Sequence, residues 1–200
     1  MDEPVGRVIL SARTIHRRVR ELAQAIQARH GTGSPLTVVV VLTGGLVFAA
    51  DLIRHLTIPV KLHVVEAASY FDRTEPCAEV LLVDRIRRDV AGQDVLIVDD
   101  VADSGSTLVR VRGQVSSYGP RSLRTCVLMR KPRARAAGVR TELVGFELET
   151  DDFVVGFGLD YGGLYRNLPE VRLLDRARTT SAASPESTGK VGRRDGIEQG

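Results

Sequence analysis

The fold is decided by one stretch in the middle of the chain, Val95-Leu96-Ile97-Val98-Asp99-Asp100-Val101-Ala102-Asp103-Ser104-Gly105-Ser106-Thr107-Leu108. Its first four residues are apolar and mostly β-branched, which is typical of a strand buried on both faces. Small residues and hydroxyls follow at 104–107, and the apolar positions 108, 111 and 115 then have helical spacing. The stretch predicts a strand over 94–98, a loop, and a helix that closes at Gly119-Pro120.

Strands and helices alternate on both sides of this stretch. The run from Leu36 to Leu42 is almost entirely β-branched and predicts a second buried strand. Further strands are predicted at 60–65 and at 123–129, where apolar residues are again concentrated. A short strand at 79–83 and a charged connection at 84–92 are expected between them.

Two further segments have the periodicity of helices. Ile15, Val19, Leu22 and Ile26 form one apolar stripe over 11–28, with Ser11 or Thr14 available as the N-cap. After Gly45, a second helix is predicted to bury positions 46, 49, 50, 53 and 56 and to end near Pro59. Alternating elements of these lengths predict an α/β domain whose central sheet is mostly parallel. We expect this domain to cover residues 1–177, followed by a disordered, polar tail over 178–200.

Composition limits the classes of function. The chain has 200 residues, 43% hydrophobic, with a net charge of +3. This mild basicity suits a phosphorylated ligand, but no long run of Lys or Arg indicates a nucleic-acid arm. Cys77 and Cys126 lie too far apart to suggest a metal cluster. We find neither a signal pattern nor a membrane span, so we expect a cytoplasmic protein.

The loop after the 94–98 strand has the chemistry of a phosphate cradle. In open α/β sheets ligands bind beyond the carboxyl ends of the strands. Small residues let backbone N–H groups approach an anion, and the following helix adds its positive end. Asp99, Asp100 and Asp103 would repel one another there unless a sugar diol and Mg²⁺ intervene. The alternative is a turn in which the Asp residues only cap the helix.

Two acids followed by Asp-Ser-Gly-Ser-Thr after a buried strand resemble the phosphoribosyl pyrophosphate (PRPP) loop of type I phosphoribosyltransferases. The resemblance implies that fold, with a small hood made from the C- and N-terminal segments. It also implies that Asp99 and Asp100 contact the ribose hydroxyls. The 5′-phosphate would be held by the segment Asp103, Ser104, Gly105, Ser106 and Thr107. Asp103 would be the general base toward purine N7. Because neighbouring strand residues point to opposite faces, Asp99 and Asp100 can meet one ribose only if the chain has left strand geometry there.

A second resemblance concerns residues 152–169, which are similar to the purine-binding region of hypoxanthine-guanine phosphoribosyltransferases. It implies that Phe153 stacks on the purine and that the Val154 backbone bonds the base edge. Asp160 would ligate Mg²⁺, and the Arg166 fork would bind pyrophosphate. Without the resemblance, Phe153 is a core residue, Asp160 a turn residue and Arg166 a surface cation.

Lys131 matches the lysine that donates to the purine 6-oxo group in these enzymes. An ammonium group has only donors, so it favours a 6-oxopurine over adenine. Arg130 stands beside it, and the match could shift by one residue. Alternatively, Lys131 is a solvated lysine at a strand end.

Two more loops match the same family. Thr43 and Gly44, between a strand and a helix, match the pyrophosphate loop, which often contains a non-proline cis peptide. Many relatives have Lys or Arg where this chain has Thr43, which leaves the binding to backbone amides. Ser69 and Tyr70 match the flexible loop that closes over the site and excludes water.

The combined reading is a Mg²⁺-dependent purine-salvage enzyme. It would convert PRPP and hypoxanthine or guanine to IMP or GMP and pyrophosphate. Two alternatives stay open: a regulator of the same fold that binds nucleic acid and senses PRPP, and a related transferase for xanthine or a pyrimidine. The family implies a homodimer or homotetramer.

Overall fold

The structure is a computed structural model that describes residues 5–31, 33–66 and 89–175. Three sequence predictions lie outside these residues: the short strand at 79–83, the loop residues Ser69 and Tyr70, and the tail over 178–200.

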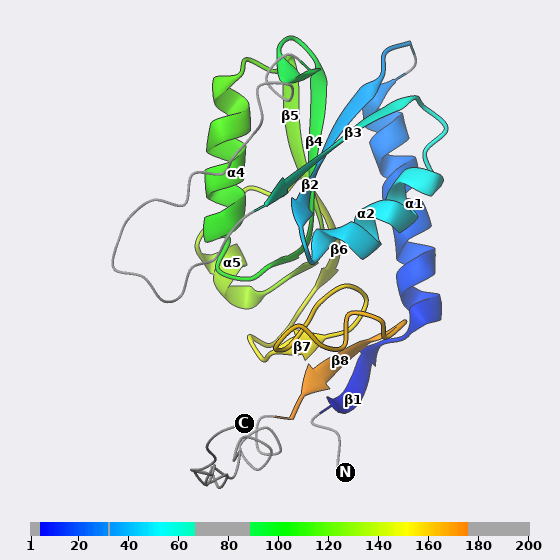
Figure 1. The fold of residues 1–200 in the computed structure, drawn as a ribbon, viewed down its shortest axis with the longest axis vertical. Coiled ribbons are helices and arrows are strands. Elements are labelled where there is room, and N and C mark those ends of the chain that lie inside the picture. Colours follow the sequence, from blue (N-terminus) through cyan, green and yellow to red (C-terminus); the bar gives the residue numbers. More distant parts are fainter. Residues whose placement is uncertain (1–4, 32, 67–88, 176–200) are drawn as a thin grey trace, which may run out of the picture.

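The core of the domain is a parallel sheet of five strands in the order β3-β2-β4-β5-β6 (Figure 1). The strands are β2 (Leu36–Leu42), β3 (Val60–Glu66), β4 (Asp94–Ala102), β5 (Ser122–Arg130) and β6 (Leu143–Glu147). Each neighbouring pair is parallel. The predicted α/β class with a parallel sheet is confirmed, and the two β-branched runs of the sequence form the neighbouring inner strands β2 and β4.

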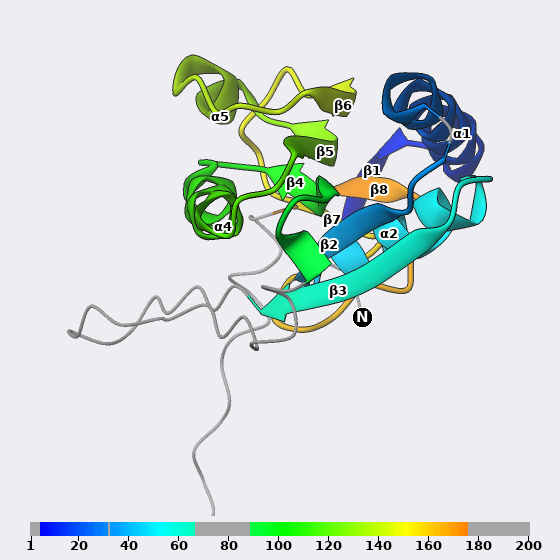
Figure 2. The ribbon, with the colours of Figure 1, turned by 90° about the horizontal axis from the view of Figure 1, so that it is seen from above.

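Helices cover both faces of the sheet (Figure 2). Helices α1 (Ala12–His30) and α2 (Gly45–Arg54) lie on one face, and α4 (Ser106–Ser117) and the short α5 (Pro132–Ala136) lie on the other. Alternate residues of the central strands therefore join separate apolar clusters: Val38 and Val40 pack with α1 and α2, and Val39 and Val41 with α4. This two-sided burial explains why these strands lack polar alternation.

A small second sheet forms the expected hood. Strands β1 (Val5–Leu10), β8 (Val171–Leu174) and β7 (Val154–Val155) pair antiparallel in the order β1-β8-β7. The hood lies beyond the carboxyl ends of the parallel strands, below the main sheet in Figure 1. Phe157, Leu159 and Val171 join the apolar cluster beneath α1 and α2. The hood is therefore packed onto the main sheet and encloses the edge where ligands bind in such folds.

Two local predictions were wrong. Helix α2 buries Gly45, Phe48, Ala49 and Leu52, whereas Leu46 and Ala50 of the predicted stripe are exposed. Five consecutive apolar residues start this helix, so periodicity alone could not select its buried face. Strand β4 also continues past residue 98 to Ala102, because β5 still pairs with it at Val101 and Ala102 after β2 has stopped pairing.

Candidate active site

A cavity of about 520 Å³ lies between the carboxyl edge of the sheet and the hood. Its walls come from four parts of the chain: the ends of β2 and β3, the end of β4, the start of α5, and the hood. The lining residues are Leu42, Thr43, Gly44, Glu66, Asp100, Val101, Asp103, Lys131, Phe153, Val154, Leu159, Asp160 and Arg166. Asp103 and Phe153 thus share one cavity, although 50 positions separate them in the sequence.

A smaller cavity of about 170 Å³ continues from the first over the loop that precedes α4. Asp99, Ser104, Gly105 and Thr107 line it, together with Asp100 and Asp103, which also line the larger cavity. The two volumes therefore form a single elongated site, with the carboxylates at the junction.

Asp99 and Asp100 lie side by side although both belong to β4. The Asp100 N–H donates to Asp99 Oδ1 at 3.0 Å, and the Asp100 carboxylate packs against Gly44, where an added Cβ would lie 1.8 Å from Oδ2. Both residues line the smaller cavity, while β4 still pairs with β5 beyond them, at Val101 and Ala102. Gly44 has no side chain at the place that the Asp100 carboxylate occupies. Convergence of the two carboxylates on one ribose stays a prediction.

Burial raises the pKa of both carboxyl groups. The pKa of Asp99 is raised well above 3.8, first by burial and then by the neighbouring Asp100 charge. The pKa of Asp100 is also raised by burial, while hydrogen bonds from Asp99 and Val101 and the Arg166 charge act against it. The presence of two ionised carboxylates is thus unfavourable here. A sugar diol or a cation that binds to both would stabilise their ionised form.

The loop at 103–107 turns sharply into α4. Gly105 is the N-cap residue, with a left-handed φ of 81°, and an added Cβ would meet the Val139 side chain at 2.2 Å. Ser104 and Ser106 contact each other through their hydroxyls at 3.0 Å. Ser104, Gly105 and Thr107 line the smaller cavity, but Ser106 is not among the lining residues. The start of α4, where the Ser106 N–H donates to Ser104 Oγ at 3.4 Å, thus adjoins a small cavity that two hydroxyl residues, Ser104 and Thr107, line.

Asp103 is contacted by two cations. Lys131, only 3% exposed, has its Nζ 3.4 Å from Asp103 Oδ1. Arg133 donates from Nε to the same oxygen and also contacts it through Nη2. Arg130, the alternative to Lys131, pairs instead with Glu147 and Thr141. The ambiguity in the sequence is therefore resolved in favour of Lys131, which lines the cavity.

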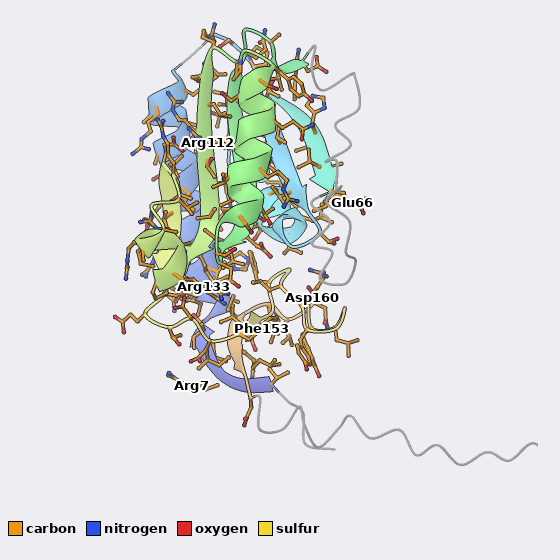
Figure 3. The ribbon with its side chains drawn as sticks, turned by 90° about the vertical axis from the view of Figure 1, so that its left-hand side faces the viewer. Arg7, Glu66, Arg112, Arg133, Phe153 and Asp160 are labelled. Atoms are coloured by element: carbon orange, nitrogen blue, oxygen red, sulfur yellow. The ribbon has the colours of Figure 1, made fainter. Side chains whose placement is uncertain are left out.

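The hood supplies the aromatic wall of the cavity. Phe153 packs edge-on against Tyr161, with ring centroids 5.8 Å apart, and Lys131 Nζ lies 5.9 Å from the Phe153 centroid. Val154 is held by antiparallel pairing of β7 with β8. Figure 3 shows Phe153 and Asp160 in the hood and Arg133 at the adjoining end of the sheet.

The remaining wall carries Thr43, Asp160 and Arg166. The Leu42-Thr43 peptide bond is cis, as the family resemblance led us to expect. Arg166 pairs through Nη2 with Asp160 Oδ1 at 2.7 Å and donates to the Gly158 carbonyl at 2.6 Å. Asp160 Oδ2 accepts from the Gly163 N–H at 2.8 Å. These contacts hold a carboxylate and a guanidinium at the mouth of one cavity.

Sequence reasoning missed three residues at or beside the site. Glu66 and Leu159 line the cavity, and Arg133 contacts Asp103. Glu66 ends a strand beside the pyrophosphate-type loop, a position that could have drawn attention to it. Arg133 carries no such signal, because its contact with Asp103 crosses from one strand end to another.

Two features are missing from the described residues: a cluster of metal-binding side chains and a membrane-spanning helix. No group of three or more His, Cys, Asp or Glu side chains is arranged to hold a metal ion there. In the same part of the chain, none of the helices has the length and apolar character needed to cross a membrane.

Comparison with known proteins agrees with this geometry. Residues 8–162 match the family model described as the phosphoribosyl transferase domain. The hypoxanthine-guanine phosphoribosyltransferase of Mycobacterium avium is 41% identical over 173 residues, which cover 84% of this chain and 85% of the relative.

Solved structures give the same result. The hypoxanthine-guanine phosphoribosyltransferase of Bacillus anthracis matches with a TM-score of 0.74 and 36% identity, over 84% of this chain and 98% of that one. A mutant hypoxanthine phosphoribosyltransferase of Trypanosoma cruzi, complexed with its product IMP, matches with a TM-score of 0.81 and 28% identity, over 92% and 99% of the two chains. This chain therefore belongs to the phosphoribosyltransferase family, as a member of its hypoxanthine-guanine group.

Proposed function

We propose that this protein transfers the phosphoribosyl group of PRPP to a ring nitrogen of hypoxanthine or guanine, giving IMP or GMP and pyrophosphate. The observation that carries the proposal is the cavity of about 520 Å³ that Asp103, Lys131 and Phe153 line together. A proton acceptor, a hydrogen-bond donor and an aromatic surface are the three groups that a 6-oxopurine nucleophile requires.

The sugar phosphate would occupy the smaller cavity. The N–H groups at the start of α4 and the hydroxyls of Ser104 and Thr107 suit a phosphate monoester. Gly105 has no side chain that would keep the phosphate away from the backbone. Ser106 belongs to the same loop, and we propose that it also contacts the phosphate, as the family resemblance implies. Asp99 and Asp100 would accept from the ribose 2′- and 3′-hydroxyls. Donation from a diol stabilises two carboxylates that otherwise repel each other, which agrees with their raised pKa values.

Pyrophosphate and Mg²⁺ would lie at the mouth of the cavity, beside Thr43, Gly44, Asp160 and Arg166. Asp160 has the hard oxygens that Mg²⁺ prefers, and this ion commonly takes one or two carboxylates with the rest from substrate and water. The lack of a three-ligand cluster among the described residues fits such a site. When bound, the ion would neutralise charge on the departing pyrophosphate.

The purine would enter the aromatic end of the cavity. Phe153 would stack on the ring, and the Val154 backbone would bond the base edge. Lys131 would donate to the 6-oxo group, and because an ammonium cannot accept a hydrogen bond, the 6-amino group of adenine would be rejected. Asp103 would accept the proton from purine N7 as the new bond forms.

Two rival functions gain less support. The relatives described above are named as transferases, and none as a regulator. Xanthine carries the same 6-oxo group, so the Lys131 donor separates it from adenine but not from hypoxanthine, and the synthesis assay below, with one base at a time, distinguishes these bases. We further propose a cytoplasmic homodimer or homotetramer.

The test is nucleotide synthesis by the purified full-length chain with PRPP, Mg²⁺ and one base at a time: hypoxanthine, guanine, xanthine, adenine, uracil or orotate. Formation of IMP and GMP, with adenine at least about 100-fold poorer in kcat/KM, is expected from a site built around a donor. Removal of Mg²⁺ by EDTA should abolish the reaction. Preferential conversion of xanthine or a pyrimidine, or no conversion of any base, would contradict the proposal.

A further inference from the structure

Arg133, in the first turn of α5, extends toward the carboxylate that we propose as the general base. Its Nε and Nη2 both contact Asp103 Oδ1, and the hydrogen bond to Asp103 raises the pKa of the Arg133 guanidinium, which stays charged. Arg133 itself is not among the residues that line the cavity. It therefore touches Asp103 from behind rather than from the substrate side.

The position of Arg133 is set by Asp151. The Arg133 backbone N–H donates to Asp151 Oδ1 at 3.2 Å, and Arg133 Nε lies 4.0 Å from the same oxygen. Lys131 Nζ also donates to the Asp151 carbonyl, at 3.5 Å. The start of α5 is thus held against the segment that precedes β7, and both cations of Asp103 are attached to the same support.

A contribution to stability alone would not account for this arrangement. The Arg133 and Asp103 side chains are 51% and 38% exposed, and ion pairs at that exposure usually contribute little to folding. Two nitrogens of the Arg133 guanidinium do, however, converge on one oxygen of the carboxylate, Oδ1, and such charge-assisted contacts favour the side-chain conformation in which Oδ1 faces Arg133. We therefore expect the contact between Arg133 and Asp103 to affect the orientation of the Asp103 carboxylate more than the stability of the fold.

Lys131 and Arg133 would play different roles in the proposed reaction. Lys131 and Arg133 both contact Oδ1 of Asp103, so the carboxylate can present Oδ2 to the cavity. Lys131 would have to share its donors with the purine 6-oxo group once a base is bound. Arg133 does not line the cavity and would not bond the purine, so its contact with Asp103 can persist through the reaction.

We propose that Arg133 is a positioning residue for the reaction: it orients the Asp103 carboxylate so that Oδ2 faces the purine nitrogen that loses its proton. This inference rests on the proposed function. A base rotated away from the proton it accepts loses rate, because general base catalysis depends on hydrogen-bond geometry in the reacting complex.

The experiment compares Arg133→Gln, Arg133→Lys and a matched control, Arg135→Gln, in the full-length protein. Arg135 lies on the same short helix, is 53% exposed and pairs with Glu147 at 3.7 Å. We expect Arg133→Gln to lower kcat about 10-fold with KM for PRPP changed less than about 2-fold. Arg133→Lys, which keeps the charge and loses the fork, should fall between it and the wild type. Arg135→Gln should match the wild type.

A double mutant tests whether Arg133 acts through Asp103. Residues that act as one unit are non-additive, so adding Arg133→Gln to Asp103→Asn should lower kcat no further. Wild-type kcat in Arg133→Gln, or the same fractional loss in both backgrounds, would overturn the inference. Thermal unfolding midpoints equal to the wild type establish that each variant folds. Failure of the wild-type protein to form any nucleotide would instead refute the proposed function.

Discussion

Asp103 and Lys131 form an ion pair whose two members the proposed reaction uses separately. Lys131 is buried and Asp103 is half-buried, with 3.4 Å between Nζ and Oδ1. The ion pair stabilises the buried Lys131 ammonium, because a buried charge without a partner is unfavourable. Once a 6-oxopurine is bound, the oxo group can accept from the ammonium and N7 can donate to the carboxylate. In the proposed reaction the same two side chains would then contact O6 and N7, which lie on one edge of the base.

The first prediction at this scale concerns Asp103. Asp103→Asn keeps the size of the side chain but removes its ability to accept a proton, so we expect kcat to fall about 100-fold or more. The KM for PRPP should change little, because Ser104 and Thr107, which line the proposed sugar-phosphate cavity, are unchanged. Steady-state kinetics with hypoxanthine measures both constants. Asp51→Asn, whose carboxylate pairs with His16 on α1, is the control, and an unchanged kcat in Asp103→Asn would remove Asp103 from the chemistry.

A second prediction concerns base selection. Lys131→Met keeps an apolar side chain packed beside Phe153 but removes the donor. We expect the ratio of kcat/KM for hypoxanthine to that for adenine to fall by about 100-fold or more, because the site no longer requires an oxo group. Competition between the two bases gives this ratio directly. Intact discrimination against adenine would show that another group reads position 6.

At the scale of elements, the site depends on how strands end and helices begin. β2, β4 and β5 each stop at the same edge of the sheet, and site residues lie between the end of each strand and the first turn of the helix that follows. Pairing of β4 with β5 continues to Ala102 and Arg130, which carries Asp103 and Lys131 to the same level above the edge. Equal strand length, rather than proximity in sequence, brings the base and the donor together.

The start of α4 allows a matched comparison of two glycines. Gly105 has φ 81°, and an added Cβ would meet Val139, so Gly105→Ala should lower the free energy of unfolding by about 1–3 kcal/mol. It should also raise the KM for PRPP. Gly113, in the same helix, has open space where a Cβ would lie, and Gly113→Ala should raise the free energy of unfolding by about 0.5–1 kcal/mol. Urea unfolding of both variants measures the changes, and equal effects would contradict the strain at Gly105.

At the scale of the whole molecule, the two ends of the sheet have different chemistry. The carboxyl end carries Asp99 and Asp100, whose pKa values burial raises. The amino end carries Asp94, which accepts from Arg121 and Ser122 and lies 3.6 Å from His30. At the carboxyl end of the sheet, burial thus makes the ionised form of the two carboxylates unfavourable. At the amino end, the Asp94 carboxylate is stabilised by its hydrogen-bond donors.

Asp94 should therefore contribute to acid stability. Hydrogen bonding from Arg121 lowers the pKa of Asp94 from 3.8 to about 2, although burial acts against it. A lowered pKa means that the folded state favours the ionised form, so the contribution is present above about pH 4 and is lost as the pH falls toward 2. Over that interval the free energy of unfolding should fall more steeply for the wild type than for Asp94→Asn.

Urea unfolding at several pH values between 4 and 2, the interval between the ordinary pKa of Asp94 and its lowered pKa of about 2, measures that slope. Arg121→Gln should reproduce the shallower slope, because it removes the main donor. Parallel curves for wild type and Asp94→Asn would show that other carboxyl groups govern acid unfolding.

Much of the fold and part of the site were predictable because they depend on residues adjacent in the chain. The β-branched run of β2 and the mixed apolar strand of β4 are buried on both faces, and such strands are recognisable without any knowledge of their partners. The residues of 99–107 were likewise recognisable as an anion loop, because a strand, small residues and a helix start follow one another directly. The contacts of Asp103 with Lys131 and Arg133 were not predictable in this way, since they join the ends of two different strands.

The amino-acid sequence by itself determined the family, the strands β2, β3, β4 and β5 and the helices α1, α2 and α4, because each is encoded by local pattern. The strands β1, β6, β7 and β8 and the short helix α5 were not predicted from it. Only the tertiary structure decided which face of α2 is buried, since apolar residues surround the start of that helix. It also decided that Lys131 rather than Arg130 enters the cavity, because neighbouring residues at a strand end point in opposite directions. Pairing, packing and cavity walls are properties of distant segments brought together, and no local pattern contains them.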